Sequence, residues 1–310
     1  MRFPSSDGGH CDRNARSVHG LKRRVKVLWR SGHSVVTFFR EQGTVMTTTV
    51  EPRFADRWER WHAARERALA DPHGWLALVS LDWLDETPRR YGTVPGLWWQ
   101  DAEAAYVDPA GAALSYEDAP VAGAQRFGLV NSGSGVRVTA GDLEIEVARR
   151  SGYLIRVHDP AAPALAAFRG VPAYDPDPAW VLTGRFTPFE SPRPTTVGAV
   201  VEGLSHVYVA PGVVTFARGG VEHTLTAFNG KAGSDLNILF TDETSGVTTY
   251  AANRSLSADV ASDGTVVLDF NRATNLPCAF TDFATCPLPP AGNHLPFAVT
   301  AGERIPYERG

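Results

Sequence analysis

The chain has 310 residues, of which 43% are apolar and 21% are charged, and its formal net charge is −4. This length allows one large domain or two ordinary ones, and the composition is that of a folded globular protein. No stretch approaches the roughly 20 apolar residues of a transmembrane helix, so we expect a cytoplasmic protein that does not contact a membrane.

The charge is distributed unevenly along the chain. Residues 1–45 contain nine Lys or Arg but only three Asp or Glu, so the remainder is acidic. Because Met46 offers a second start, we interpret residues 1–46 as a basic leader outside the fold. The alternatives are a nucleic-acid-binding arm or an export signal built on Arg23 and Arg24, although the segment lacks aromatic interleaving and a continuous apolar core. The acidic remainder argues against nucleic acid as a partner, since phosphate binding needs a basic face.

The first predicted element is an amphipathic helix within residues 47–74. Trp58, Trp61 and Leu69 recur at helical spacing, while Arg and Glu residues occupy the opposite face. Pro72 ends the pattern. We expect this helix to pack across a β domain, and the alternative is a helix that binds a partner.

Residues 75–172 predict a first antiparallel β unit that is similar to a sandwich. Short β-branched and aromatic runs are separated there by Gly, Pro, Asp and Ser turns. Within this unit, residues 142–159 form the clearest pair of runs, so we expect a hairpin with Ser151-Gly152 at its tip.

A second antiparallel β unit is predicted over residues 173–310. The sequence Asp175-Pro-Asp-Pro178 interrupts any ladder at its start, because Pro lacks an amide donor. Further strand-like runs follow, and the segment from Arg218 to Gly220 predicts a hairpin tip. The predicted fold class is therefore mainly β, with an N-terminal amphipathic helix followed by two packed antiparallel β units in the form of sandwiches, barrels or one of each.

Residues 271–296 form an unusually long loop between the strands predicted at 265–270 and 297–300. A compact domain seldom leaves so long a segment without helix or strand unless it is functional or disordered. Disorder is unfavourable here because the segment and its end carry apolar anchors. These anchors are Leu276, Phe280, Phe283, Leu288, Leu295 and Phe297.

Several motifs resemble one known family. DFNRATNLPCAF at 269–280, CPLPP at 286–290, and NHLP and AGE within 293–303 are similar to the signature of the bacterial family called domain of unknown function 1684. GWLALVSLDWL, DPDPAWVLTGRFTPF and TDETSGVTTYAANRSL follow that family's order and spacing, so the resemblance covers roughly residues 54–303. The chain departs from the family at Leu276, where Pro is usual, and after Glu86. The resemblance implies kinship of fold, and it implies no particular activity.

Polar residues at strand ends beside the long loop are the candidate site, because antiparallel strands that end at one rim bring such groups together. The ligand-binding candidates are Arg254, Tyr250, Asn271, Asn275 and Asn293, and the acid–base candidates are Asp242, Asp269 and His294. We expect the strand that begins near Arg254 to form a hairpin with the strand at 265–270, and Arg254 to pair with Asp269. Its remaining donors would suit a carboxylate or phosphate. The alternative is that these Asp, Asn and Arg side chains only cap turns and fix loops.

Standard catalytic motifs are missing. NSGSG at 131–135 lacks the spacing of a nucleophile elbow, and the sequence has no P-loop, no Rossmann glycine fingerprint and no H-E-x-x-H. His206 and His223 could bind a metal if they met, but such residues more often serve packing. We therefore predict no metal and no cofactor.

Two cysteines of the long loop, Cys278 and Cys286, are expected to be reduced, buried thiols, because cytoplasmic compartments keep thiols reduced. One alternative is a zinc site that includes His294. Another is a nucleophilic Cys278 that is activated by His294 or Arg272.

These observations predict a protein that binds a small polar molecule, bearing a carboxylate or a phosphate, in a pocket roofed by the long loop. One alternative is a hydrolase-type enzyme that uses carboxylate or His acid–base chemistry. The other is an interaction module, since the first unit is similar to a forkhead-associated sandwich in which Arg89, Arg90 and Thr93 would hold a phosphopeptide. The oligomeric state is left open.

Overall fold

The computed structural model describes residues 53–128, 135–230 and 235–307, and the backbone of three strands before them. The chain divides into two compact units, residues 1–57 and residues 58–310. In the first unit, β1 (Val25–Arg30), β2 (His33–Phe38) and β3 (Met46–Val50) form an antiparallel sheet with β2 at its centre. The side chains of these strands lie outside the described residues, and the interpretation of residues 1–46 as a leader stays a prediction.

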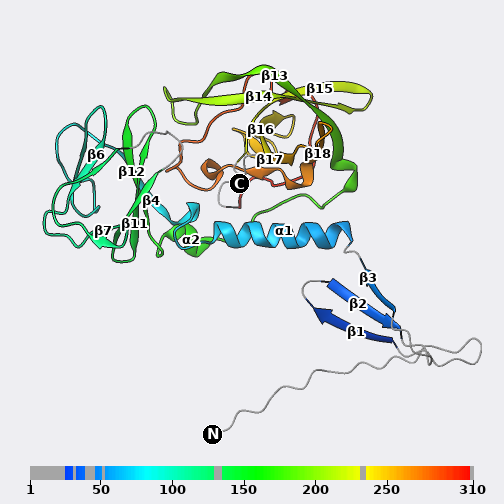
Figure 1. Cartoon of the computed structure of the whole chain (residues 1–310), viewed down its shortest axis with the longest axis horizontal. Coiled ribbons are helices and arrows are strands. Elements are labelled where there is room, and N and C mark those ends of the chain that lie inside the picture. Colours follow the sequence, from blue (N-terminus) through cyan, green and yellow to red (C-terminus); the bar gives the residue numbers. More distant parts are fainter. Residues whose placement is uncertain are drawn as a thin grey trace, which may run out of the picture. The chain divides into compact units, whose positions relative to one another are not determined.

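The predicted helix is present as α1 (Phe54–Leu69). Its acidic Asp56 lies in the first turn and its basic Arg67 in the last, which is the arrangement that the helix dipole favours. Leu69 is buried, and the indole N–H of Trp58 donates to the backbone carbonyl of Asn271 at 2.8 Å. These contacts attach α1 to the β structure, and Figure 1 shows the helix running beside the barrel strands.

Two sheets follow, packed face to face as a sandwich. The strands are β4 (Leu78–Trp83), β5 (Leu97–Gln100), β6 (Ala105–Asp108), β7 (Ser115–Tyr116), β8 (Ala119–Pro120), β9 (Gln125–Phe127), β10 (Val136–Ala140), β11 (Leu143–Arg149) and β12 (Tyr153–His158). One sheet has the order β4-β12-β11-β10-β7-β8 and the other the order β5-β6-β9. Trp98 and Phe127 of the smaller sheet share one core with Ile145 and Ile155 of the larger one. The predicted hairpin is confirmed, because β11 and β12 pair from Arg149 and Tyr153 outward.

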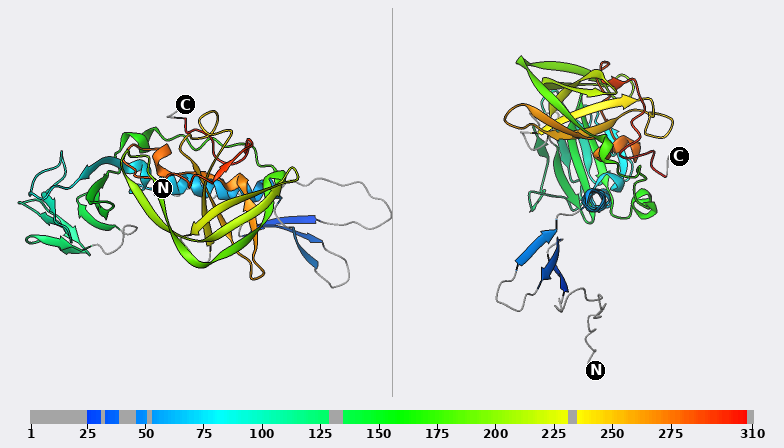
Figure 2. Two further views of the ribbon diagram at one scale, coloured as in Figure 1. Left: turned by 90° about the horizontal axis from the view of Figure 1, so that it is seen from above. Right: turned by 90° about the vertical axis from the view of Figure 1, so that its right-hand side faces the viewer.

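The second large sheet closes on itself. The short helix η1 (Trp75–Ala77) leads into β4 of the sandwich, whereas α2 (Pro163–Ala167) and η2 (Pro178–Trp180) precede this second sheet. Its strands are β13 (Val181–Gly198), β14 (Ser205–Arg218), β15 (Val221–Asn229), β16 (Asp235–Asp242), β17 (Arg254–Asp259), β18 (Thr265–Asp269) and β19 (Thr274–Asn275), in the order β18-β13-β14-β15-β16-β17-β19. A single antiparallel bridge, between Val260 just after β17 and Val266 of β18, joins the two sides of the seam. The result is a barrel, whose curvature Figure 2 shows.

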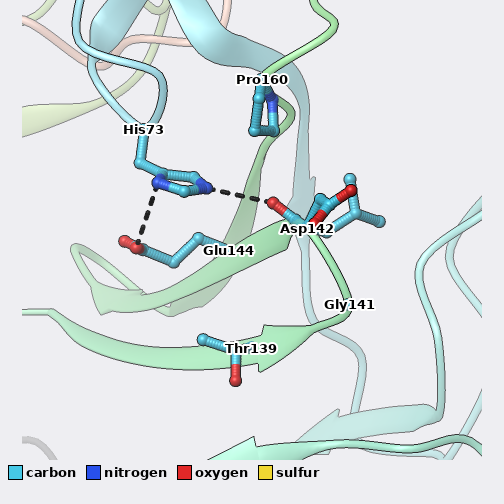
Figure 3. A pocket seen from close by; sticks show the side chains of 7 residues that line it. His73, Thr139, Gly141, Asp142, Glu144 and Pro160 are labelled. Atoms are coloured by element: carbon cyan, nitrogen blue, oxygen red, sulfur yellow. Dashed lines mark hydrogen bonds and ion pairs between the residues drawn. The ribbon is translucent and has the colours of Figure 1, made fainter.

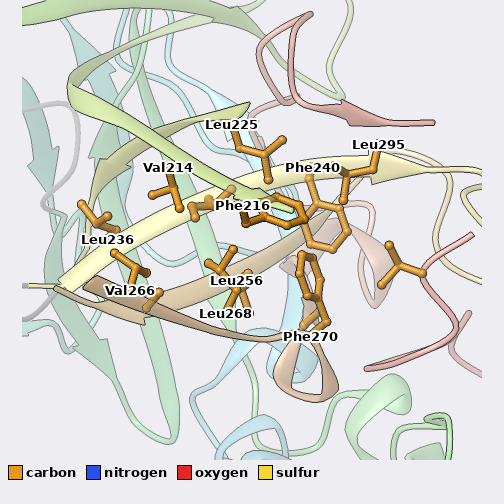
Figure 4. Packing of buried hydrophobic residues seen from close by; sticks show 14 of the residues in the cluster. Val214, Phe216, Leu225, Leu236, Phe240, Leu256, Val266, Leu268, Phe270 and Leu295 are labelled. Atoms are coloured by element: carbon orange, nitrogen blue, oxygen red, sulfur yellow. The ribbon is translucent and has the colours of Figure 1, made fainter. Parts of the chain in front are cut away.

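The interior of the barrel is filled by side chains (Figure 4). Phe240 and Phe270 meet edge to face with ring centroids 5.5 Å apart, and Phe216 lies 5.8 Å from Phe270. Trp180, which is buried, lies 6.2 Å from Phe270 and closes one side of the same cluster. Such packing makes the centre of the barrel a hydrophobic core, so a ligand site must lie outside it.

The hairpin tip predicted at Arg218 to Gly220 is confirmed. β14 ends at Arg218 and β15 begins at Val221, which leaves Gly219 and Gly220 as the turn. Both glycines have positive φ, 59° and 79°. Two-residue hairpin turns of this kind require such angles, which glycine adopts without strain.

The predicted hairpin between the strand at Arg254 and the strand at 265–270 forms only at its tip, where Val260 and Val266 make an antiparallel bridge and the amide of Ala261 donates to the carbonyl of Thr265 at 2.9 Å. β17 pairs with β16 and β19, whereas β18 pairs with β13. These two strands follow each other in sequence but lie at the seam of the barrel, where only one bridge connects them. The twist of a closing sheet separates the strands there, so proximity in sequence does not produce a ladder.

The long loop contains short regular elements of its own. η3 (Phe270–Arg272) precedes β19, η4 (Pro277–Ala279) follows it, and β20 (His294–Leu295) pairs in parallel with the end of β16. The expected fold class is confirmed: the chain is mainly β, with antiparallel sheets and one N-terminal amphipathic helix. In the described residues no helix is long and apolar enough to cross a membrane.

Candidate functional site

Arg254, the first residue of β17, forms a buried ion pair with Asp242, the last residue of β16. Their Nη2 and Oδ2 atoms are 2.7 Å apart, and the side chains are 1% and 0% exposed. Arg254 also donates to the carbonyls of Val299 and Ala301, and Asp242 accepts from the amide of Thr244 at 2.8 Å. Burial lowers the pKa of Arg254, and the charge of Asp242 opposes this effect. The pair therefore fastens the segment after the long loop to the barrel.

The predicted pairing of Arg254 with Asp269 is wrong. Asp269 lies 3.3 Å from the guanidinium of its neighbour Arg272, and it accepts from the side chain of Asn271 at 2.9 Å. Asn271 also exchanges two hydrogen bonds of 2.9 Å with the backbone of Asp177. Asp269 and Asn271 thus form a separate cluster, which joins the start of the long loop to the segment before β13.

Asn275 belongs to a second buried clamp. The Glu303 carboxylate, which is 0% exposed, accepts from Arg65 Nε at 2.9 Å and from the amide of Asn275 at 2.6 Å. Arg65 also donates to the carbonyl of Asn275 at 2.9 Å, and the Asn275 side chain donates to the carbonyl of Arg304 at 2.8 Å. This clamp attaches α1 to the end of the barrel.

Two atoms near this clamp are buried without a hydrogen-bond partner among the described residues. They are Arg254 Nε, a donor, and Asn275 Oδ1, an acceptor. Arg254 and Asn275 are directly paired across β17 and β19, so their side chains point to the same face.

The remaining candidates lie apart from these clusters. The amide side chain of Asn293 is saturated by the backbone of Thr226, with bonds of 2.8 and 2.9 Å, and by the carbonyl of Leu239 at 2.8 Å. The Tyr250 hydroxyl donates to the carbonyl of Cys278 at 2.9 Å. His294 is half exposed. The structure thus places Asp242, Arg254 and Asn275 together and the others elsewhere, and their catalytic or binding roles stay predictions.

His294 is the only acid–base candidate near the surface among the described ones. Its Nδ1 lies 3.2 Å from Thr241 Oγ1, and its Nε2 lies 3.3 Å from the carboxylate of Glu243. Both ring nitrogens therefore face neighbours on β16 and just after it.

A different cluster, which sequence reasoning missed, lies where the sandwich meets the barrel. We call it the junction cluster. It consists of Arg150, Arg156, His206, Tyr208, Thr285 and Cys286, contributed by the β11–β12 loop, β12, β14 and the long loop. Arg150 Nε donates to Thr285 Oγ1 at 3.3 Å, and His206 Nε2 donates to the carbonyl of Thr285 at 2.6 Å. Residues distant in sequence therefore converge on one residue of the long loop.

Arg156 is the innermost charge of the junction cluster. Its side chain is 2% exposed, its Nη2 donates to Glu146 at 2.7 Å, and its guanidinium lies 5.1 Å from the ring of Trp75. Its Nε is buried without a partner among the described residues. Burial alone would raise the pKa of Glu146, but hydrogen bonding with His158 and the charges of Arg156 and Arg137 lower it to about 2.

The other members of the junction cluster are perturbed by burial and by positive charge. Burial, followed by the charge of Arg156, lowers the pKa of Arg150. Burial also lowers the pKa of His206, against the hydrogen bond to Thr285, and Arg150 lowers it further. Burial raises the pKa of Tyr208, against the effect of Arg150. Positive charge is thus in excess here, and burial disfavours it further.

A sequence signal for Arg156 exists in hindsight. All six residues of β12, YLIRVH, are buried, because one face of the strand packs in the sandwich core and the other faces Trp75 and the barrel. An Arg inside a strand with no polar alternation indicates a charge buried between two layers.

A shallow pocket of about 310 Å³ lies on the sandwich, away from the long loop (Figure 3). It is lined by His73, Thr139, Gly141, Asp142, Leu143, Glu144 and Pro160. The His73 ring lies 3.0 Å from the carbonyl of Asp142 and 4.0 Å from Glu144, which also pairs with Arg137 at 2.7 Å. The polar groups of this pocket are therefore engaged with one another.

Cysteines and histidines are the sequence candidates for a thiol or metal site. Cys278 and Cys286 are buried thiols, as expected. His206 and His223 do not meet, since they are paired with Val197 and Phe216 at different points of the barrel sheet. No group of three or more His, Cys, Asp or Glu side chains that could hold a metal ion occurs within the described ranges.

Two further sequence hypotheses concern the β unit predicted at residues 75–172. Arg89, suggested as a phosphopeptide contact, pairs with Asp85 at 2.7 Å and lies 4.6 Å from the ring of Tyr91. The forkhead-associated interpretation stays a prediction. The NSGSG motif at 131–135 falls almost wholly outside the described residues.

Comparison with known proteins gives three results. No curated protein matches the chain. A solution structure of an uncharacterized protein from Haloarcula marismortui is 32% identical, with coverage of 46% of this chain and 80% of that chain, and a TM-score of 0.39. Residues 166–304, which contain the barrel and the long loop, match the family model described as protein of unknown function (DUF1684). The chain therefore belongs to the DUF1684 family.

Proposed function

We propose that the protein binds a small molecule carrying a carboxylate or a phosphate at the junction cluster, beside the long loop. The observation that carries this proposal is the charge of the cluster. Two guanidinium groups, of Arg150 and Arg156, lie near one carboxylate, Glu146, and the buried Arg156 keeps an N–H without a partner among the described residues.

Burial of positive charge is costly unless an anion accompanies it. An anionic ligand between Arg150 and Arg156 would relieve their mutual repulsion, which already lowers the pKa of Arg150. Guanidinium forks match the planar geometry of carboxylate and phosphate oxygens. The position between two β layers, beside a long loop, is also where ligand sites tend to occur.

The ligand would approach from the Arg150 side. Arg150 and His206 are only partly buried, whereas Arg156 is enclosed. The Thr285 hydroxyl and backbone hold Arg150 and His206 in place. An anion would therefore meet pre-positioned donors at the edge and the buried charge behind them, which limits the entropic cost of binding.

The test uses the full chain and thermal melts with inorganic phosphate and with acetate, each matched in ionic strength by chloride. We expect phosphate or acetate to raise the melting temperature of the native chain beyond the chloride control. Arg150→Gln should lose most of this rise. Arg126→Gln, which removes an exposed Arg 3.5 Å from Glu103 on the sandwich, should retain it. An equal rise in Arg150→Gln, or no rise in the native chain, would show that the junction cluster is not an anion site.

A further inference from the structure

Cys278 and Cys286 lie within reach of each other at the two sides of one turn of the long loop. They are eight positions apart, and the Cys278 amide donates to Cys286 Sγ at 3.2 Å. The side chain of Cys278 also lies close enough to Cys286 to raise the pKa of its thiol. Both residues are only 6% exposed.

The backbone of each cysteine is held independently of its sulfur. The Tyr250 hydroxyl donates to the carbonyl of Cys278 at 2.9 Å, and the amide of Val200 donates to the carbonyl of Cys286 at 3.0 Å. The side chain of Asn253 donates to the carbonyl of the next residue, Pro287, at 2.8 Å. Neighbouring elements therefore hold both cysteines by their backbone, and the 3.2 Å between the Cys278 amide and Cys286 Sγ places the second sulfur beside the first residue.

We propose that Cys278 and Cys286 are a modification site, at which peroxides oxidise the two thiols to a reversible intramolecular disulfide. This proposal goes beyond anion binding and does not depend on it, since it rests on the sulfur geometry and the backbone anchors alone.

The reaction begins at Cys278. The hydrogen bond with Cys278, followed by burial, raises the pKa of Cys286, so Cys286 stays a thiol and stabilises a thiolate on its neighbour. The Cys278 thiolate attacks one oxygen of hydrogen peroxide, the O–O bond breaks, and Cys278 becomes a sulfenic acid while the leaving hydroxide takes up the proton that the Cys278 thiol released. The Cys286 sulfur then attacks the Cys278 sulfur, the S–O bond breaks, and water leaves. Two thiols thereby lose two electrons, and one peroxide becomes two water molecules.

A disulfide at this position closes the turn formed by residues 279–285. Closure restricts the unfolded chain more than the folded one, in which the turn is already anchored. We therefore expect the oxidised protein to melt about 5 °C higher than the reduced protein. The effect should disappear after reduction with dithiothreitol.

The experiment uses the full chain with Cys11→Ser, which removes the third cysteine. The protein is treated with hydrogen peroxide, alkylated, digested without reduction and analysed by mass spectrometry. We expect one peptide pair linked through Cys278 and Cys286, formed with the loss of both thiols together. Thiols that stay reduced in the native protein under excess peroxide, or a linkage that lowers the melting temperature, would overturn the proposal.

The order of the two steps is tested with Cys278→Ser and Cys286→Ser in the same background. Cys278, which remains in Cys286→Ser, should form a sulfenic acid at least about tenfold faster than Cys286, which remains in Cys278→Ser. Dimedone traps the sulfenic acid in both variants. Equal rates in the two variants would contradict Cys278 as the sulfur that reacts first. Because no anion is present in this assay, its outcome is independent of binding at the junction cluster.

Discussion

Removal of Arg254 tests whether the buried ion pair holds the end of the barrel together. Arg254→Met keeps most of the apolar stem and removes the charge. Asp242 then remains buried, at 0% exposure, with its Oδ2 unpaired. The carbonyls of Val299 and Ala301 lose a donor as well.

The expected loss of stability follows from these contacts. Breaking a buried pair by removing one partner costs about 3–5 kcal/mol, because an uncompensated charge stays in the interior. For a unit of this size, that loss corresponds to a fall in melting temperature of about 10 °C. Since domains are stabilised by roughly 5–15 kcal/mol, the variant should still fold at room temperature.

The assay is urea unfolding of the full chain, followed by tryptophan fluorescence. Arg126→Met serves as the matched control, since Arg126 and Glu103 are both exposed and 3.5 Å apart, and such a pair contributes less than about 1 kcal/mol. Combining Arg254→Met with Asp242→Leu should recover part of the loss, because both charges are then absent. If Arg254→Met costs no more than Arg126→Met, the buried pair does not anchor the segment after the long loop.

Two further predictions concern single side chains. The pKa of Glu146 is about 2 in the fold, below its ordinary value of 4.5. Ionised Glu146 therefore stabilises the fold by about 3 kcal/mol above pH 4.5, and this contribution is lost as the pH falls from 4.5 to 2. Melting temperatures between pH 2 and pH 7 should therefore fall more steeply in the native chain than in Glu146→Gln, and parallel profiles would contradict this. Asn293→Ala removes three hydrogen bonds to backbone groups and should cost about 3 kcal/mol in urea unfolding. The matched control is His294→Ala, because His294 is the half-exposed neighbour of Asn293 and its removal should lower the free energy of unfolding by less than about 1 kcal/mol. Equal losses in the two variants would argue against a structural role for Asn293.

Local features of the fold could be predicted because their cause is local. Gly219-Gly220 specifies a turn with positive φ, and the alternation within residues 142–159 specifies a hairpin, so both were found from sequence. The same holds for α1, whose apolar spacing is visible within 16 residues. The boundaries of the two β units, at residues 172 and 173, stay a prediction.

Side-chain partners could not be predicted, because they depend on closure of the barrel. Arg254 and Asp269 lie on strands that follow each other in sequence, which suggested a hairpin and a salt bridge. In the barrel these strands meet at a single bridge, and Arg254 instead faces Asp242 on its other neighbour, β16. The amide groups of Asn271 and Asn293 bind backbone distant in sequence for the same reason.

The junction cluster could not be predicted because it lies between layers. Arg150 belongs to the sandwich and Thr285 to the long loop, 135 positions away. Neither residue type indicates a site by itself. Only the packing of one layer on the other brings Arg150 Nε within 3.3 Å of Thr285 Oγ1.

The clamp formed by Arg65, Asn275 and Glu303 has a consequence for the order in which the protein acquires its structure. Arg65 and Glu303 are 238 positions apart, and Arg254 also depends on carbonyls at Val299 and Ala301. During synthesis α1 emerges early, but its charged anchor has no partner until residues 299–303 have been added. Contacts of such long range slow folding, because a large loop must close before any of them forms. The nascent chain thus lacks the anchors of α1 and Arg254 until the last of these residues arrives, and this interval is when the chain most needs protection from aggregation.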